Sequence, residues 1–146
     1  MDDIYFYERC GANDRLRGVV VLVHPQLYCD PLNKRNHVGV ICEGDIDFDR
    51  IYVDFNYNVG LFSADGLLSF LPADKIHDNF TNSSAALNPA EAIALRRVDV
   101  LVRFGGVTEK INAMRTARDY PAIQALCVES LQDQISREII TQYSRD

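Results

Sequence analysis

The stretch from His37 to Ile76 reads HVGVICEGDIDFDRIYVDFNYNVGLFSADGLLSFLPADKI. Apolar and polar residues alternate along it in short runs, and Gly, Asn and Asp separate the runs. Alternation of this kind is typical of strands that bury one face, and these three residue types are typical of tight turns. The stretch therefore predicts small antiparallel strands, including a hairpin that reverses direction at Asn56-Tyr57-Asn58.

Two more strands are predicted on the N-terminal side of this stretch. Val19–Val23 contains five apolar residues, four of them Val, which indicates a strand that is buried on both faces. Alternation over Ile4–Glu8 indicates another strand. Residues 25–36, with two Pro and two Asn, are predicted to form a loop.

The C-terminal part of the chain is predicted to be helical. Residues 77–87 are small and polar, and we expect a linker there. Asn88 can then cap a helix that ends at Phe104, because Pro89 and Glu91 suit its first turn. The Val-rich run 98–104 also fits a strand, and the sequence leaves that choice open.

Two further helices are predicted after Gly105-Gly106. Thr108 caps the first of them, and Pro121 opens the second. The apolar row of this last helix repeats every four residues at Cys127, Leu131, Ile135, Ile139 and Tyr143. Such a stripe packs on neighbouring helices or extends into a seam between two copies of the chain.

Charge and composition limit the classes of function. The 146 residues are 47% hydrophobic and carry a formal net charge of −6. Residues 1–80 hold seven Lys or Arg and thirteen Asp or Glu, whereas residues 81–146 hold eight of each. The acidic half should repel a phosphate backbone, which weighs against nucleic-acid binding. No apolar run reaches a membrane span and the start resembles no export signal, so we expect a cytoplasmic protein.

The succession of strands and loops resembles an SH3-like small barrel and is similar to barrels that include KOW-type modules. The resemblance covers about half of the chain and is carried by Val19–Val23, Leu27–Asn36, Val38–Ile41, Ile51–Phe55 and Val59–Leu71. KOW modules often bind RNA or ribosomal protein. This segment departs from them because it lacks a second Gly and a basic surface.

We therefore predict an α+β protein in two units. An N-terminal SH3-like antiparallel β-barrel over residues 1–76 precedes the linker at 77–87 and a three-helix segment over residues 88–146. The predicted function is non-enzymatic protein–protein interaction or assembly. The partner is a protein, and two copies of the chain can pair through the C-terminal helix.

The predicted binding face lies on the hairpin, at Tyr52, Asp54, Tyr57 and Phe62. An outward Tyr52 beside Asp54 gives an aromatic and acidic surface, which suits a peptide with Pro or basic residues. The alternative interpretation is that these aromatic rings cover the edge of the core.

Two other functions remain open. A nucleic-acid-associated accessory protein would use Lys34 and Arg35 in the loop and Arg96, Arg97 and Arg103 on the first helix. A small enzyme would use a Cys–His pair, and His24 and His37 each lie five residues before a cysteine, Cys29 and Cys42.

No metal site or cofactor is predicted. The alternating acids Glu43, Asp45, Asp47 and Asp49 suggest a calcium loop at first sight. Counted from Asp45, however, Arg50 stands where such a loop needs Gly, and Asn56 stands where it needs Glu. A solvated acidic rim explains these residues better.

Overall fold

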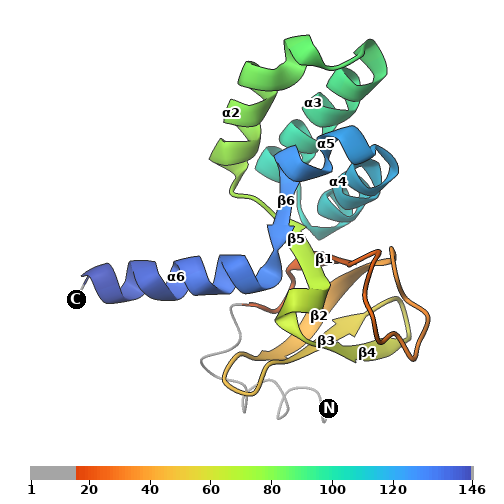
Figure 1. The fold of residues 1–146 in the computed structure, drawn as a ribbon, viewed down its shortest axis with the longest axis vertical. Helices are drawn as coiled ribbons and strands as arrows, with labels where there is room; N and C mark the ends of the chain where they lie inside the picture. The colour runs from red at the N-terminus through yellow and green to blue at the C-terminus, as the bar shows by residue number, and fades with distance from the viewer. Residues whose placement is uncertain (1–15, 146) are drawn as a thin grey trace.

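The structure is a computed structural model that describes residues 16–145, with side chains to residue 138. It is a mixed α+β fold in which an antiparallel sheet lies against a helical layer (Figure 1). The strands are β1 (Val20–Val23), β2 (Val38–Asp45), β3 (Arg50–Asp54), β4 (Val59–Phe62), β5 (Leu67–Phe70) and β6 (Val128–Ser130). The helices are α2 (Ala73–Ser83), α3 (Pro89–Phe104), α4 (Val107–Asp119), α5 (Pro121–Cys127) and α6 (Leu131–Arg145), with 3₁₀ turns η2 (Ala64–Gly66) and η3 (Ser84–Ala86).

The six described strands form one sheet in the order β4-β3-β2-β1-β5-β6, and every neighbouring pair is antiparallel. Among these strands β4 and β6 are the two edges, so the sheet is open. The hairpin between β3 and β4 reverses at Asn56 and Tyr57, as the sequence predicts. The predicted strand at Ile4–Glu8 lies outside the described residues.

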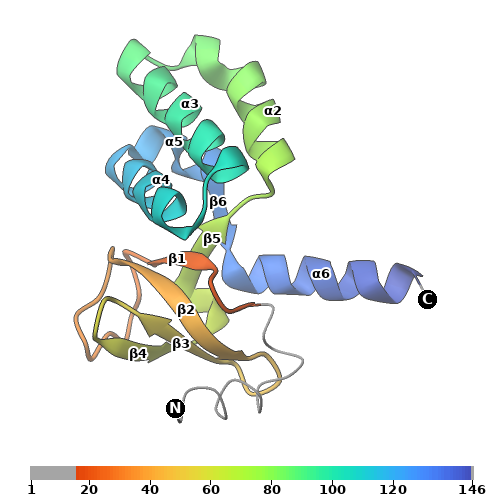
Figure 2. The same ribbon diagram turned by 180° about the vertical axis from the view of Figure 1, so that it is seen from behind.

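Strand β1 is buried on both faces, which confirms the prediction from its run of valines. Val21 and Val23 face a core that includes Ile51 and Val53. Val20 and Leu22 face the other way and pack with Met114 of α4. Figure 2 shows α4 lying beside β1. Side chains on the two faces of this one short strand therefore pack against the core of the sheet and against the helical layer, and so join the two layers.

The helical layer is built around its own core, which includes Ile76, Leu95, Val98 and Ile123. Its longest helix, α3, begins with the predicted capping box, because Asn88 accepts the N–H of Glu91 and Glu91 accepts that of Asn88. This helix continues to Phe104, so the Val-rich run is helical and not a strand. Val98 is fully buried there, and its packing offsets the modest helix propensity of valine.

The segment expected as a linker at 77–87 is instead mostly helical. Residues 77–83 complete α2, and η3 follows directly. The helix buries Ile76 and partly buries Phe80, four residues later, against the helical core. These two apolar residues, one turn apart, place α2 against the helical core, and polar contacts from His77 and Asn79 add to their packing. Small polar residues hid this pattern from the sequence analysis.

The predicted third C-terminal helix is interrupted. Residues 128–130 form β6, which pairs with β5 and separates α5 from α6. Cys127 accordingly lies in the helical core, whereas Leu131 and Ile135 lie in the core of the sheet. The row that repeats every four residues thus serves two different cores. Five α-helices, rather than three, follow β5 within residues 16–145.

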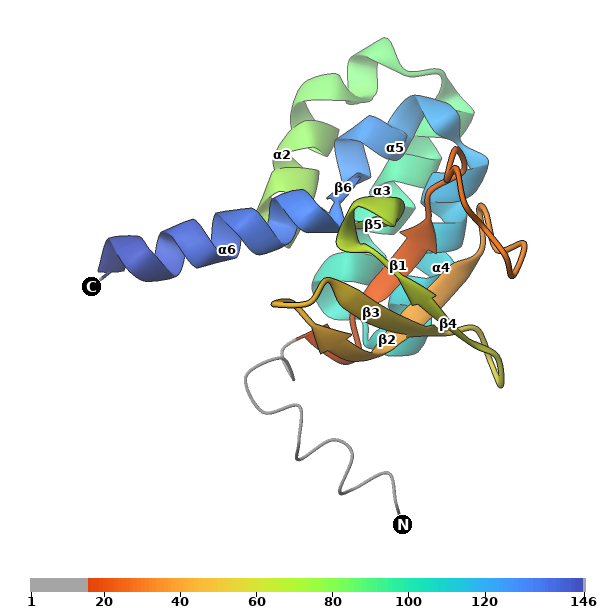
Figure 3. The same cartoon turned by 60° about the horizontal axis from the view of Figure 1, so that its bottom comes forward.

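Helix α6 contacts η2, β5 and β6 near its start and then projects away from the rest of the molecule (Figure 3). The side chains of Ile139 and Tyr143 lie outside the described part, so pairing of two copies through this helix stays a prediction. None of the helices within residues 16–145 combines the length and apolar composition that crossing a membrane requires.

Gly39 in β2 allows the third strand to pack closely. A Cβ atom at this position would lie 2.5 Å from Val53 Cγ1 and 2.9 Å from the Phe55 ring. We expect Gly39→Ala to lower the free energy of unfolding by about 1–3 kcal/mol, because the fully buried Val53 has little room to move.

Urea denaturation measures this change. The matched control is Gly106→Ala, where the nearest atom to the added Cβ is 3.5 Å away, and we expect a loss of at most about 1 kcal/mol. Equal losses in the two variants would show that close packing at Gly39 is not the cause.

Candidate functional site

The outer face of the β3–β4 hairpin carries an exposed apolar row. Strand β4 forms one edge of the sheet, and its Val59 and Leu61 are 54% and 55% exposed. The register places Leu61 opposite Tyr52 and Val59 opposite Asp54. Since cross-strand partners share a face, these four side chains lie together on the outside of the hairpin.

The tip of this hairpin is held in an unusual backbone conformation. Asn56 and Tyr57 have φ angles of 70° and 80°. The carboxylate of Asp54 accepts both of their N–H groups, at 2.9 and 3.2 Å. Positive φ is common for asparagine but strained for an aromatic residue. Tyr57 is 96% exposed, so packing offsets little of this strain.

The four predicted binding residues are only partly brought together. Tyr52 and Asp54 lie on the outer face, and Tyr57 stands at the tip. Phe62 points inward, is 8% exposed and packs edge-on against Phe55 with ring centroids 5.8 Å apart. Val59 and Leu61 were not predicted as binding residues; their spacing of two residues in a strand, which places both side chains on one face, was the signal that indicates them.

The basic residues predicted for nucleic acid fall in two separate places. Lys34 and Arg35 lie in the loop before β2, and the three arginines lie on α3. Lys34 sits 5.3 Å from the centroid of the Phe55 ring, and the Arg35 guanidinium donates to the carbonyls of Leu27 and Tyr28. These side chains support the local fold of the loop.

The predicted Cys–His pairs are not joined by any hydrogen bond between described residues. His24 accepts the N–H of Gln26 through Nδ1, and Cys29 is exposed. The Cys42 thiol donates to the carbonyl of Tyr52. Burial raises the pKa of the Cys42 thiol, which keeps it protonated and disfavours its use as a nucleophile.

The acidic residues near the β2–β3 connection support its turn. Asp45 accepts the N–H of Phe48, and Asp49 accepts the N–H of Ala64 at 2.8 Å. No group of three or more His, Cys, Asp or Glu side chains in the part of the chain that the structure describes is placed to hold a metal ion.

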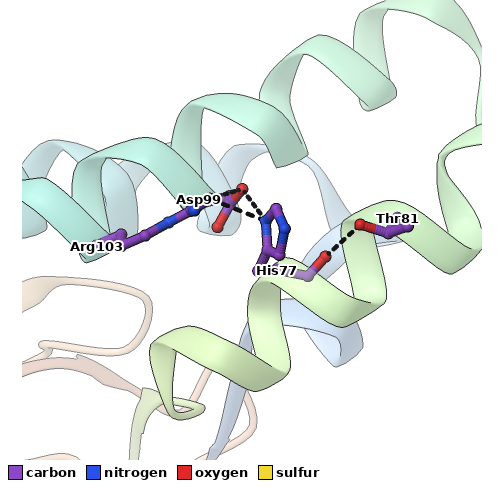
Figure 4. A network of polar contacts seen from close by, with 4 residues as sticks. All are labelled: His77, Thr81, Asp99 and Arg103. Atoms are coloured by element: carbon purple, nitrogen blue, oxygen red, sulfur yellow. Dashed lines mark hydrogen bonds and ion pairs between the residues drawn. The ribbon is translucent and has the colours of Figure 1, made fainter.

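A buried charge joins α2 to α3 (Figure 4). Asp99 is 3% exposed, and its Oδ2 lies 2.6 Å from an Arg103 nitrogen and 3.0 Å from His77 Nδ1. Its other oxygen, Oδ1, is buried and accepts no hydrogen bond from a described residue. His77 is about half exposed, so the carboxylate orients an imidazole that water can still reach.

This cluster was not predicted from the sequence, although the sequence contains a signal for part of it. Asp99 interrupts an apolar run, VDVLV, and Arg103 follows four residues later on the same side of the helix. The contact with His77 had no such signal, because the segment that contains it was expected to be a linker. Asp99 contacts Arg103 on its own helix and His77 on α2, so the geometry indicates a structural clamp between the two helices.

Comparisons with known proteins give no relative. The chain matches no family model, no curated protein and no solved structure. Function must therefore be inferred from the geometry of the described residues, and the hairpin offers the clearest exposed surface.

We expect Asp99→Asn to lower the free energy of unfolding by about 1–3 kcal/mol, because the buried partner of Arg103 and His77 loses its charge. Urea denaturation measures the loss. The control is Asp119→Asn, whose ion pair with Arg118 is mostly exposed and whose removal should cost at most about 1 kcal/mol. A loss no larger than in this control would show that the contacts of Asp99 with Arg103 and His77 do not stabilise the helical layer.

The thiol of Cys127 should make stability fall at high pH. Burial, with a smaller contribution from the Asp99 carboxylate, raises the pKa of this thiol to about 12 from an ordinary value of 9.0. The unfolded chain releases the proton first, so the contribution is complete below pH 9.0 and is lost as the pH rises toward 12. The slope is at most about 1.4 kcal/mol per pH unit.

The measurement is the free energy of unfolding of the natural chain and of Cys127→Ala between pH 8 and the highest pH at which the chain folds. We expect the difference between them to shrink as the pH rises, because only the natural chain loses this contribution. Cys29→Ala, at an exposed position, should keep a constant difference from the natural chain. A constant difference for Cys127→Ala would contradict the prediction.

Proposed function

We propose that this chain is a protein-interaction module whose β3–β4 hairpin binds an extended peptide segment of a partner protein. The observation that carries this proposal is the exposed apolar row on an edge strand, Val59 and Leu61 beside Tyr52. An extended segment can pair with an open strand edge through its backbone and fit alternate side chains against such a row.

Edge strands are commonly protected from pairing by charged residues, prolines or bulges. Strand β4 has the sequence VGLF and contains no charge and no proline. The bulge in this part of the sheet lies at Ile41–Glu43, between β2 and β3, and so leaves regular the outer edge of β4, which pairs with no other strand of residues 16–145. This edge is therefore suited to accept another strand.

The strained tip adds a second line of support. Tyr57 occupies a conformation that glycine adopts freely, at a cost of about 1 kcal/mol, and exposes nearly its whole side chain. The two-residue turn requires a positive φ at both Asn56 and Tyr57, and glycine would meet this requirement at Tyr57 without strain. A strained residue with an exposed side chain is often kept for a function. An exposed aromatic face suits proline or a basic side chain.

Charge indicates which partner fits. Residues 16–70 contain seven Asp or Glu and four Lys or Arg, so the sheet half is acidic. The preferred partner is an extended segment in which apolar residues alternate with Lys or Arg. We also propose that this half of the chain is related in fold to an SH3-like barrel. The strand order and the long loop between β1 and β2 support this proposal.

The proposal is tested by selecting peptides from a random display library on the full chain. We expect the selected peptides to alternate apolar and basic residues and to bind at least tenfold more weakly, by about 1.4 kcal/mol or more, to Leu61→Lys. The matched control is Ile93→Lys, which places the same charge at a 70% exposed position on α3 and should leave binding unchanged.

Tyr57→Gly separates binding from folding. We expect it to raise the thermal stability, because glycine relieves the positive φ, and to weaken peptide binding. A fall in stability would assign Tyr57 to the fold. Peptides that bind Leu61→Lys as well as the natural chain would overturn the hairpin as the binding surface.

A further inference from the structure

A cavity of about 460 Å³ lies where the sheet meets the helical layer. We call it the junction cavity. Its walls come from the residues before and within β1, from β5, from the start of α2, and from α3, α4 and α6. This volume is within the range typical of small-molecule sites. Segments far apart in the sequence line the junction cavity, so no local sequence motif predicts it.

The junction cavity concentrates positive charge in an acidic protein. Three cationic side chains line it, Arg17, Lys110 and Arg137, with one lining acid, Glu138, and a second acid, Glu129, paired with Arg137, while the whole chain carries −6. Arg137 is held by two hydrogen bonds to the Glu129 carboxylate, at 2.7 and 2.8 Å. These bonds fix the guanidinium at the wall of the cavity.

Lys110 supplies a charge that the described residues do not neutralise. It is half-buried on α4 and forms no ion pair with any residue of the described range. An ammonium group beside a sheltered volume attracts an anion more strongly than one in open water. The α2 helix also begins at this wall, at Ala73, and its positive end adds to the same field.

The remaining walls are partly polar and partly apolar. Ser69 on β5 is 1% exposed, and its hydroxyl donates to Gln134 on α6. The amide of Gln134 in turn donates to the Glu138 carboxylate at 3.4 Å, so Gln134 is a hydrogen-bond partner of the one acid that lines the cavity. Val20, Phe70 and Val102 provide apolar surface. A suitable ligand has a charged end and an apolar end.

We infer that the junction cavity binds a small organic anion, a carboxylate or a phosphate monoester joined to an apolar group, with Lys110 as its main counter-charge. This site is independent of the hairpin, because none of its lining residues belongs to β3 or β4. The competing interpretation is a gap between two layers that holds only solvent.

The test titrates the full ¹⁵N-labelled chain with three probes that share a benzene ring: phenyl phosphate, phenylacetate and the neutral benzyl alcohol. We expect one or both anions to shift the amide signals of Val20, Ser69 and Phe70 and to bind at least about tenfold more tightly than benzyl alcohol. The tighter anion distinguishes a phosphate site from a carboxylate site.

Variants then test the role of Lys110. Lys110→Gln should weaken anion binding about tenfold, and Lys110→Arg should retain it, because arginine keeps the charge. The control is Lys75→Gln, an exposed lysine on α2 that does not line the cavity. If Lys110→Gln does not fold, the comparison of the anions with benzyl alcohol on the natural chain still decides the inference.

Three results would overturn it. The first is the absence of amide shifts at millimolar anion. The second is equal binding of benzyl alcohol and the anions, which would show that charge plays no part. The third is equal weakening by Lys75→Gln and Lys110→Gln, which would show a diffuse attraction in place of a site.

Discussion

The packing of β1 on both of its faces is the constraint on which the rest of the structure depends. Val21 and Val23 need cover on one side of the sheet, and Val20 and Leu22 need it on the other. A single antiparallel sheet with one wet face cannot provide both. The chain supplies the second cover with helices, which is why α4 lies against β1 and why the two layers form one molecule.

The strands next to β1 form the buried centre of the sheet, and β4, far from β1, forms an exposed edge among the described strands. Neighbours of β1 are covered by helices, whereas β4, three strands away, keeps Val59 and Leu61 exposed. The same division places the junction cavity beside β1, where the sheet meets the helical layer, whereas no residue of the hairpin lines it. Two surfaces of different chemistry can thus coexist on a small chain without sharing residues.

Most local patterns predicted local structure well, although the predicted cap at Thr108 is wrong, because α4 begins at Val107 with Gly106 as its N-cap. The valines of β1, the Asn88 cap and the turn at Asn56-Tyr57 each report on their own segment, and the structure agrees with all three. Long-range placement was beyond the sequence. The segment 77–87 was predicted as a linker because Ile76 and Phe80, the apolar residues that hold α2, lie among polar residues. The row that repeats every four residues predicted one continuous helix, whereas β6 divides it. Phe62 was predicted on the binding face, yet the register places it opposite the buried Ile51, and no polar residue in VGLF marks which face of β4 is buried. Lys110 has no distinctive neighbours in sequence, and only the fold brings it to a cavity.

The return of the chain to the sheet through β6 also governs when the protein can fold. Leu131 and Ile135 belong to the same core as Val21 and Ile51, which precede them by 80 to 114 residues (131 − 51 and 135 − 21). A ribosome that has released only the first strands has therefore not yet supplied the residues that close their core. The core of the sheet is complete only after Leu131 and Ile135 have been synthesised, and until then part of its apolar face is open to chaperones and to other nascent chains.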